Sequence, residues 1–317
     1  MRLSLCLALA LAHVPAVACA QAPAAAATPA APIEVTDDGL VATWYPPAAG
    51  KKGPVIVALG GSEGGTIGSK ALARALAKQG YGVLALAYFG APGLPQTLQN
   101  VPLEYFDHAL AWVARQPLVD PKRIAIYGIS IGGETALLVA ARHPEITAVV
   151  AAVPSSVVWQ GFDRRDYRSV ESTYSLGGKG IAYLPYDTSK PFTGVYALYA
   201  DSLANVSAHP DAVIPVERIG GAVLLLSGDA DTLWPSRRMC EQIVERLKAH
   251  GFRNPYRHLA FADAGHGAFA PPSDAPARNS GYDNLGGTEA GNAAARAGMW
   301  QAVTEFLAAQ LIGKAKR

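Results

Sequence analysis

One serine in this sequence stands in a pattern that favours nucleophilic chemistry. Residues Gly128 to Gly132 read G-I-S-I-G, with Ser130 at the centre. An apolar run that predicts a strand ends just before the pattern, and a predicted helix begins with it. Such a strand–turn–helix setting exposes a serine on a sharp turn, beside the free N–H groups of a helix N-terminus. Ser130 is therefore predicted to attack an acyl carbonyl; a glycine-rich turn with a capping serine is the alternative.

A serine hydroxyl is a weak nucleophile unless a base removes its proton and an acid orients that base. In hydrolases of this kind the acid and then the histidine follow the serine along the chain. Asp231 follows an apolar run in the spacing G-x-x-D-x-x-x-P, and we predict it as the acid, with Asp229 as second candidate. His266 lies in a glycine-flanked loop after the last predicted strand, and we predict it as the base.

Acyl transfer through a tetrahedral intermediate also needs two N–H donors for the oxyanion. The residue after the nucleophile, Ile131, is expected to supply one. The loop over residues 60–65, G-G-S-E-G-G, is expected to supply the other, with Ser62 as first candidate and Gly61 as second. The same loop lacks the Lys-Ser/Thr ending of a phosphate-binding P-loop, so nucleotide binding is not expected.

The elements that must position these residues alternate along the chain. Short apolar runs predict buried strands over residues 55–59, 81–87, 123–127, 148–153, 222–227 and 256–261. Helical periodicity predicts helices over residues 69–79, 102–116, 132–143, 236–250 and 289–311. This alternation predicts an α/β fold, with a mostly parallel sheet covered by helices on both faces. Residues 33–35 and 40–45 are expected to add an antiparallel edge.

One stretch breaks this alternation. Residues 155–217 are irregular and rich in Tyr, Gly, Asp and Arg. Long segments of this kind in a compact domain commonly carry function. We therefore predict that they form a lid insertion over the site.

The first residues have the features of an export signal. Residues 1–20 combine a positive start, an apolar run too short to span a bilayer, and a small-x-small cleavage pattern, which makes Gln21 the expected mature start. Lipid attachment at Cys19 is the weaker alternative, because the lipobox match is poor. Residues 21–32 form an Ala/Pro-rich leader, and residues 33–317 the hydrolase domain. The predicted location is periplasmic or secreted.

Composition excludes several other classes of protein. The formal net charge of +2 gives no reason to expect a nucleic-acid partner, and no segment of the mature chain is apolar enough to span a membrane. Cleavage after residue 20 leaves Cys240 as the single cysteine, expected to be a buried small side chain. No Cys/His cluster has metal-binding spacing, so we expect neither metal nor cofactor. The expected partner is a small acyl ester or thioester, and nothing indicates an oligomeric state.

Several segments resemble the catalytic domain of the acyl-CoA thioesterase and bile acid-CoA:amino acid N-acyltransferase family. They are Leu84–Pro95, Pro102–Phe106, Val119–Ile124, Pro154–Gly161, Ile214–Ile219 and Leu285–Thr288. The resemblance extends from about Pro54 to the C-terminus. It implies an α/β-hydrolase fold and a Ser or Cys nucleophile with Asp and His, which match Ser130, Asp231 and His266. Because transferring members of that family use Cys and hydrolysing members use Ser, Ser130 favours hydrolysis.

The sequence departs from that family in two respects. Its two-domain members carry a β-sandwich before the catalytic domain, whereas the folded part here is expected to begin near Ile33. An exported enzyme would rarely meet coenzyme A thioesters, which are cytoplasmic. The predicted function is therefore an exported serine hydrolase that cleaves acyl thioesters or carboxylic esters. An acyltransferase using an amine or alcohol acceptor and a peptidase on the same fold are the alternatives.

Overall fold

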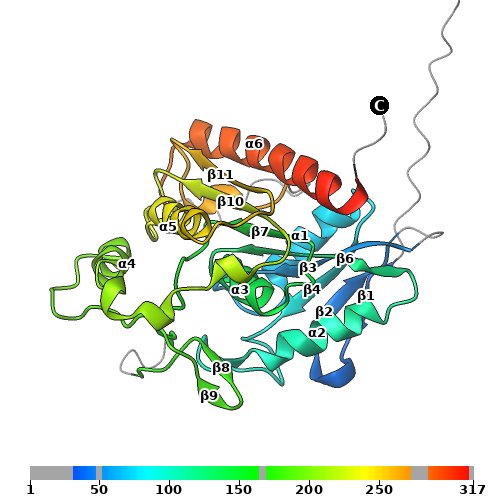
Figure 1. Ribbon diagram of the computed structural model, residues 1–317, viewed down its shortest axis with the longest axis horizontal. Coiled ribbons are helices and arrows are strands. Elements are labelled where there is room, and N and C mark those ends of the chain that lie inside the picture. Colours follow the sequence, from blue (N-terminus) through cyan, green and yellow to red (C-terminus); the bar gives the residue numbers. More distant parts are fainter. Residues whose placement is uncertain (1–30, 48–51, 164–168, 273–284, 314–317) are drawn as a thin grey trace, which may run out of the picture.

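A sheet of eight strands forms the centre of the computed structural model (Figure 1). Its order is β1 (Ile33–Val35), β2 (Val41–Tyr45), β4 (Gly82–Ala87), β3 (Gly53–Leu59), β6 (Val119–Ile129), β7 (Ala148–Ala152), β10 (Ala222–Gly228) and β11 (Tyr256–Phe261). β2 pairs antiparallel with both β1 and β4, and every other neighbouring pair in this sheet is parallel. The predicted α/β fold, with its mostly parallel sheet and antiparallel edge, is confirmed.

The structure describes residues 31–47, 52–163, 169–272 and 285–313. The signal peptide predicted over residues 1–20, with its Cys19 alternative, and nearly all of the leader over 21–32 lie outside these ranges and stay predictions. Within the described ranges, no helix has both the length and the apolar character that a membrane span requires.

Helices cover both faces of the large sheet. One face packs against α2 (Glu104–Ala114), α3 (Ile131–Arg142) and α5 (Ser236–Ala249), and the other against α1 (Ile67–Ala77) and α6 (Glu289–Leu307). Successive residues of β3 show why: Val55 and Val57 point into the first core, and Ile56 into the second. A strand buried on both faces is apolar at every position, which explains the continuous apolar runs.

The chain between β7 and β10 forms the predicted insertion, which projects from the body on the left of Figure 1. It contains β8 (Tyr174–Leu176), β9 (Lys179–Gly180) and α4 (Val195–Leu203). A second sheet joins β8 and β9 to β5 (Val101–Pro102). The short 3-10 helices are Asp37–Gly39, Val206–Ala208, Pro210–Ala212, Val216–Arg218 and His266–Phe269, and a π-helical turn over Ala308–Ile312 ends the fold.

The second helix differs from its prediction. It was expected to begin at Pro102, but α2 begins at Glu104, and Val101–Pro102 is strand β5. The Val101 N–H donates to the Thr173 carbonyl oxygen at 2.8 Å. This partner lies in the insertion, far along the chain, so local helical periodicity carries no sign of the pairing.

Candidate active site

Ser130 occupies a strained turn between β6 and α3. Its φ of 60° and ψ of −125° lie outside the regions that a side-chain-bearing residue prefers. The Ser130 N–H donates to the Ala152 carbonyl oxygen of β7 at 2.8 Å, which helps to hold the turn. The structure therefore gives Ser130 the backbone conformation of a nucleophile elbow.

Close backbone approach explains the glycines of the G-x-S-x-G pattern. A Cβ atom at Gly128 would overlap the Gly132 carbonyl oxygen, and one at Gly132 would overlap the Gly60 carbonyl oxygen. The loop after β3 is thereby brought directly against the start of α3. Both glycines are needed because no side chain fits where the two chain segments meet.

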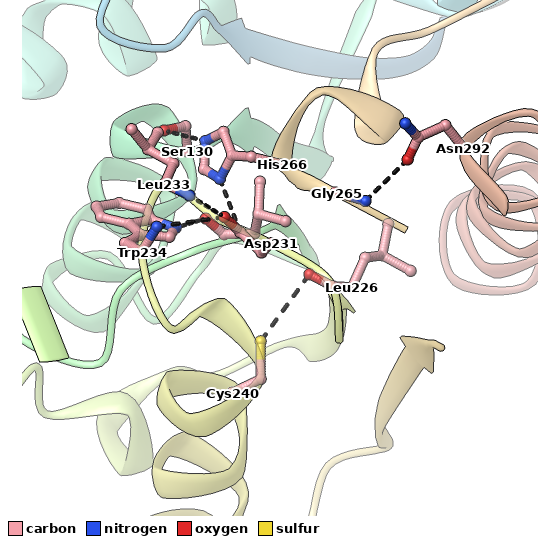
Figure 2. Close-up of polar contacts among 10 residues, drawn as sticks. Ser130, Leu226, Asp231, Leu233, Trp234, Cys240, Gly265, His266 and Asn292 are labelled. Carbon is pink, nitrogen blue, oxygen red and sulfur yellow. Dashed lines mark hydrogen bonds and ion pairs between the residues drawn. The ribbon is translucent and has the colours of Figure 1, made fainter. Parts of the chain in front are cut away.

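The three residues predicted to act together lie in one hydrogen-bonded chain (Figure 2). His266 Nε2 lies 2.9 Å from Ser130 Oγ, and His266 Nδ1 lies 2.8 Å from Asp231 Oδ2. Exposure is 8% for Ser130 and 6% for each of the other two. In the tautomer in which Nδ1–H donates to Asp231, Nε2 is free to accept the serine proton.

The loop that follows β10 fixes the carboxylate of Asp231. Asp231 Oδ1 accepts the N–H groups of Leu233 at 2.9 Å and Trp234 at 3.2 Å (Figure 2). The second candidate acid, Asp229, is exposed and pairs instead with Arg237 at 2.5 Å. The structure therefore brings Asp231, and not Asp229, to His266.

The N–H groups of the predicted oxyanion donors differ in whether they already have an acceptor. The Gly61 N–H donates to Glu63 Oε1 at 3.0 Å. The N–H groups of Ser62 and Ile131 donate to no acceptor in the part of the chain that the structure describes. A Cβ atom at Gly61 would lie 3.4 Å from Ser130 Cβ, so this loop borders the nucleophile.

Trp234 is a neighbour of His266 that the sequence did not single out. Its ring meets the His266 ring edge-to-face, with centroids 5.6 Å apart, and its indole N–H donates to the Val153 carbonyl oxygen at 3.2 Å. On its other side, the ring centroid of Tyr199 in α4 lies 5.4 Å away. In the sequence, only its position three residues after Asp231 could have indicated that it lies near the site.

Glu134 is a second residue that the sequence did not single out. It lies in the first turn of α3 and is fully buried. Its Oε1 accepts the Trp159 N–H at 3.4 Å, and its Oε2 has no hydrogen-bond partner among the described residues. Burial raises the pKa of this carboxyl group well above its ordinary value. Burial therefore favours the neutral form of this carboxyl group within α3.

Cys240 matches its prediction as a buried small side chain. It lies on α5, fully buried, with Sγ 3.9 Å from the Leu226 carbonyl oxygen (Figure 2). Burial raises the pKa of its thiol, which favours the unreactive protonated form. Cys240 therefore takes no part in the Ser130 arrangement.

Comparison with known proteins identifies relatives of the chain. Residues 101–313 match the family described as BAAT / Acyl-CoA thioester hydrolase C terminal. Acyl-coenzyme A thioesterase 1 of Rattus norvegicus is 28% identical over 295 residues, which cover 89% of this chain and 66% of the relative. Acyl-coenzyme A amino acid N-acyltransferase 2 of Rattus norvegicus is 28% identical over 284 residues, 86% of this chain and 63% of the relative. The chain thus spans slightly less than two thirds of these relatives' length.

Solved structures show the same fold. A puromycin-hydrolyzing peptidase of Mycobacterium tuberculosis aligns with a TM-score of 0.57 at 18% identity. The alignment covers 88% of this chain and 39% of the peptidase. At this identity the likeness concerns the α/β-hydrolase fold alone.

Proposed function

Because the chain belongs to the BAAT / acyl-CoA thioester hydrolase family, we propose that it is a serine hydrolase that cleaves acyl thioesters or carboxylic esters. The observation that carries the proposal is the continuous chain from Ser130 Oγ through both nitrogens of His266 to Asp231. A nucleophile, a base and an orienting acid are the groups that acyl-enzyme chemistry requires.

The proposed reaction has two halves. His266 Nε2 takes the proton of Ser130 as Oγ attacks the acyl carbonyl carbon, and Asp231 stabilises the imidazolium that forms. The N–H groups of Ile131 and Ser62 bind the oxyanion. The intermediate collapses, His266 protonates the leaving thiolate or alkoxide, and an acyl-enzyme remains. Water then repeats the sequence and releases the acid.

The proposed substrate class follows from the relatives. The rat relative is named an acyl-coenzyme A thioesterase, which supports a thioester as the bond cleaved. Ser130 stands where acyl-transferring members of the family use Cys, which supports water as the acceptor. A carboxylic ester passes through the same tetrahedral intermediate, so it belongs to the same proposal.

The test is Ser130→Ala, with Ser189→Ala as the matched control because Ser189 is an exposed serine of the insertion. We expect Ser130→Ala to lower kcat on p-nitrophenyl esters and acyl-CoA thioesters by about a thousandfold or more. It should also abolish labelling by a fluorophosphonate, whereas Ser189→Ala keeps both. Full activity in Ser130→Ala would exclude the mechanism, and turnover of peptide amides alone would indicate a peptidase.

Acyl transfer is the second candidate, because one relative is named an N-acyltransferase. It uses the same acyl-enzyme and differs only in the acceptor. Adding an amino acid or an alcohol to the same assay separates the two. Hydrolysis predicts that products divide by mass action alone; an excess of amide or ester product would favour transfer.

We also propose that the protein is exported, on the signal-like pattern of residues 1–20. The measurement is N-terminal sequencing of protein recovered from the periplasm of a bacterial host. The expected first residue is Gln21. An intact Met1 would contradict export, whereas a lipid-modified Cys19 would contradict only cleavage after residue 20. For an exported enzyme, a carboxylic ester is the more accessible substrate.

A further inference from the structure

In the loop after β3, the peptide group between Gly60 and Gly61 is held at both its carbonyl oxygen and its N–H. The Tyr88 hydroxyl donates to the Gly60 carbonyl oxygen at 2.9 Å, and Gly132 of the elbow packs against the same oxygen. Tyr88 is itself buried, directly after β4. The first peptide of the loop is thus clamped between the sheet and the nucleophile helix.

The N–H side of the same Gly60–Gly61 peptide group is held by Glu63. Its Oε1 accepts the Gly61 N–H at 3.0 Å. A Cβ atom at Gly60 or at Gly68 would overlap this same oxygen, so the carboxylate end occupies space that two glycines leave open. Glu63 as a whole is exposed, yet its carboxylate is drawn back into the loop. This space indicates that the Glu63 carboxylate is packed in the loop and is not freely solvated.

The contact between Glu63 and Gly61 occupies one of the two N–H groups of the loop that are candidates for binding an oxyanion. The Gly61 N–H is committed to Glu63, whereas the N–H of Ser62 has no acceptor among the described residues. A Cβ atom at Gly61 would lie 3.4 Å from Ser130 Cβ, so Gly61 borders the nucleophile, and a shift of this peptide would move the neighbouring Ser62 N–H relative to Ser130.

We propose that Glu63 is a positioning residue of the oxyanion hole, because its carboxylate fixes the Gly60–Gly61 peptide group, directly before the Ser62 N–H that binds the oxyanion. This inference rests on the proposed hydrolase function. Glu63 acts through the backbone and does not itself touch the acyl group. By accepting the Gly61 N–H, the carboxylate holds the loop geometry that a pre-organised donor requires.

The test compares three substitutions at this position. Glu63→Ala removes the acceptor, Glu63→Asp keeps the charge but shortens the arm, and Glu63→Gln keeps an oxygen at the same reach. Glu305→Ala, at an exposed residue of α6, is the control. The readouts are kcat and KM for a p-nitrophenyl ester, the Ki of an alkyl boronic acid that forms a tetrahedral adduct, and the melting temperature.

We expect Glu63→Ala and Glu63→Asp to lower kcat by about tenfold to a hundredfold, since losing one oxyanion donor costs about 10²–10³. KM and the melting temperature should change little, and boronic acid affinity should fall with kcat. Glu63→Gln should restore kcat to within about threefold of wild type, because its amide oxygen can accept the Gly61 N–H.

Three results would overturn the inference: unchanged kcat in Glu63→Ala, increased kcat in that variant, or equal impairment in Glu63→Gln. An increase would mean that the carboxylate opposes the oxyanion. Equal impairment in Glu63→Gln would mean that charge, and not acceptance of the hydrogen bond, matters. If Ser130→Ala retained activity, the hydrolase proposal itself would fail; loss of activity in Ser130→Ala with wild-type kcat in Glu63→Ala would refute this inference alone.

Discussion

Glu134 is an ionisable residue that the proposed reaction does not use. It lies four residues after Ser130, and the Glu134 N–H donates to the Ser130 carbonyl oxygen at 3.1 Å, in the first turn of α3. Its side chain reaches the backbone of Trp159, so one carboxyl group joins the nucleophile helix to the insertion. Because burial disfavours the charged form, we interpret Glu134 as an uncharged side chain that links α3 to the insertion through a hydrogen bond.

The raised pKa of Glu134 predicts how stability changes with pH. The folded protein keeps this proton at pH values where the unfolded chain releases it, so the stabilisation is complete below the unfolded pKa and declines as pH rises above it. Glu134→Gln is always neutral and lacks this dependence. Above the ordinary carboxyl pKa, wild type should lose about 1.4 kcal/mol per pH unit relative to Glu134→Gln, until the raised pKa is reached.

Urea unfolding of both proteins at several pH values measures this difference. Glu305→Gln, at an exposed glutamate, serves as the control and should follow wild type. Parallel stability curves for wild type and Glu134→Gln would show that Glu134 is ionised in the folded protein.

At the scale of elements, α4 joins the insertion to the candidate site through aromatic contacts. The ring centroid of Tyr199 lies 4.9 Å from that of Trp159 and 5.4 Å from that of Trp234. Trp234 in turn packs against His266. We therefore expect the position of the imidazole to depend on how α4 packs, in agreement with the lid predicted for the insertion.

Tyr199→Ala tests this dependence. It would remove the ring between Trp159 and Trp234, and we expect the free energy of unfolding to fall by about 3 kcal/mol. The loss of packing on Trp234 should also lower kcat on a p-nitrophenyl ester by about tenfold, which corresponds to about 1.4 kcal/mol.

Tyr199→Phe is the matched control, because it removes only the hydroxyl group, whose contact with the Tyr186 hydroxyl is long at 3.4 Å. It should change either quantity little. A destabilised Tyr199→Ala with wild-type kcat would limit α4 to a role in stability.

At the scale of the whole molecule, topology explains why residues far apart in sequence meet. Ser130, Asp231 and His266 follow β6, β10 and β11, and the Ser62 loop follows β3. These four strands are parallel within one sheet, so their carboxyl ends lie along a single edge. Open α/β sheets place their sites at that edge.

The two cores give this edge a rigid support. Residues of α2, α3 and α5 fill one face of the sheet, and residues of α1 and α6 fill the other. The insertion has a smaller apolar cluster of its own, which includes Trp159, Leu184 and Leu203 and takes in Trp234 and Met239 from the body. The loops that carry Ser130, Asp231 and His266 therefore lie between the large sheet and a separately packed insertion.

Local sequence determined the fold class and the order of the three candidate residues. Strand and helix periods depend on which side chains face a core, and an elbow depends on glycines beside its serine; both are short-range properties. For this reason the sequence predicts β11 at its observed bounds, Tyr256–Phe261, and indicates Ser130, Asp231 and His266 without knowledge of their contacts.

Only the tertiary structure decided which groups pair across long distances. Val101 joined a strand because residues of the insertion offered it a partner, and Asp231 rather than Asp229 reached His266 because the turn after β10 directs the two carboxylates apart. The raised pKa of Glu134 follows from its burial, to which segments distant in sequence contribute. The hydrogen bond from the Gly61 N–H to Glu63 is local in sequence. Its proposed role in the oxyanion hole depends on Ser130 lying near Gly61, and the folding of the sheet brings Ser130 there.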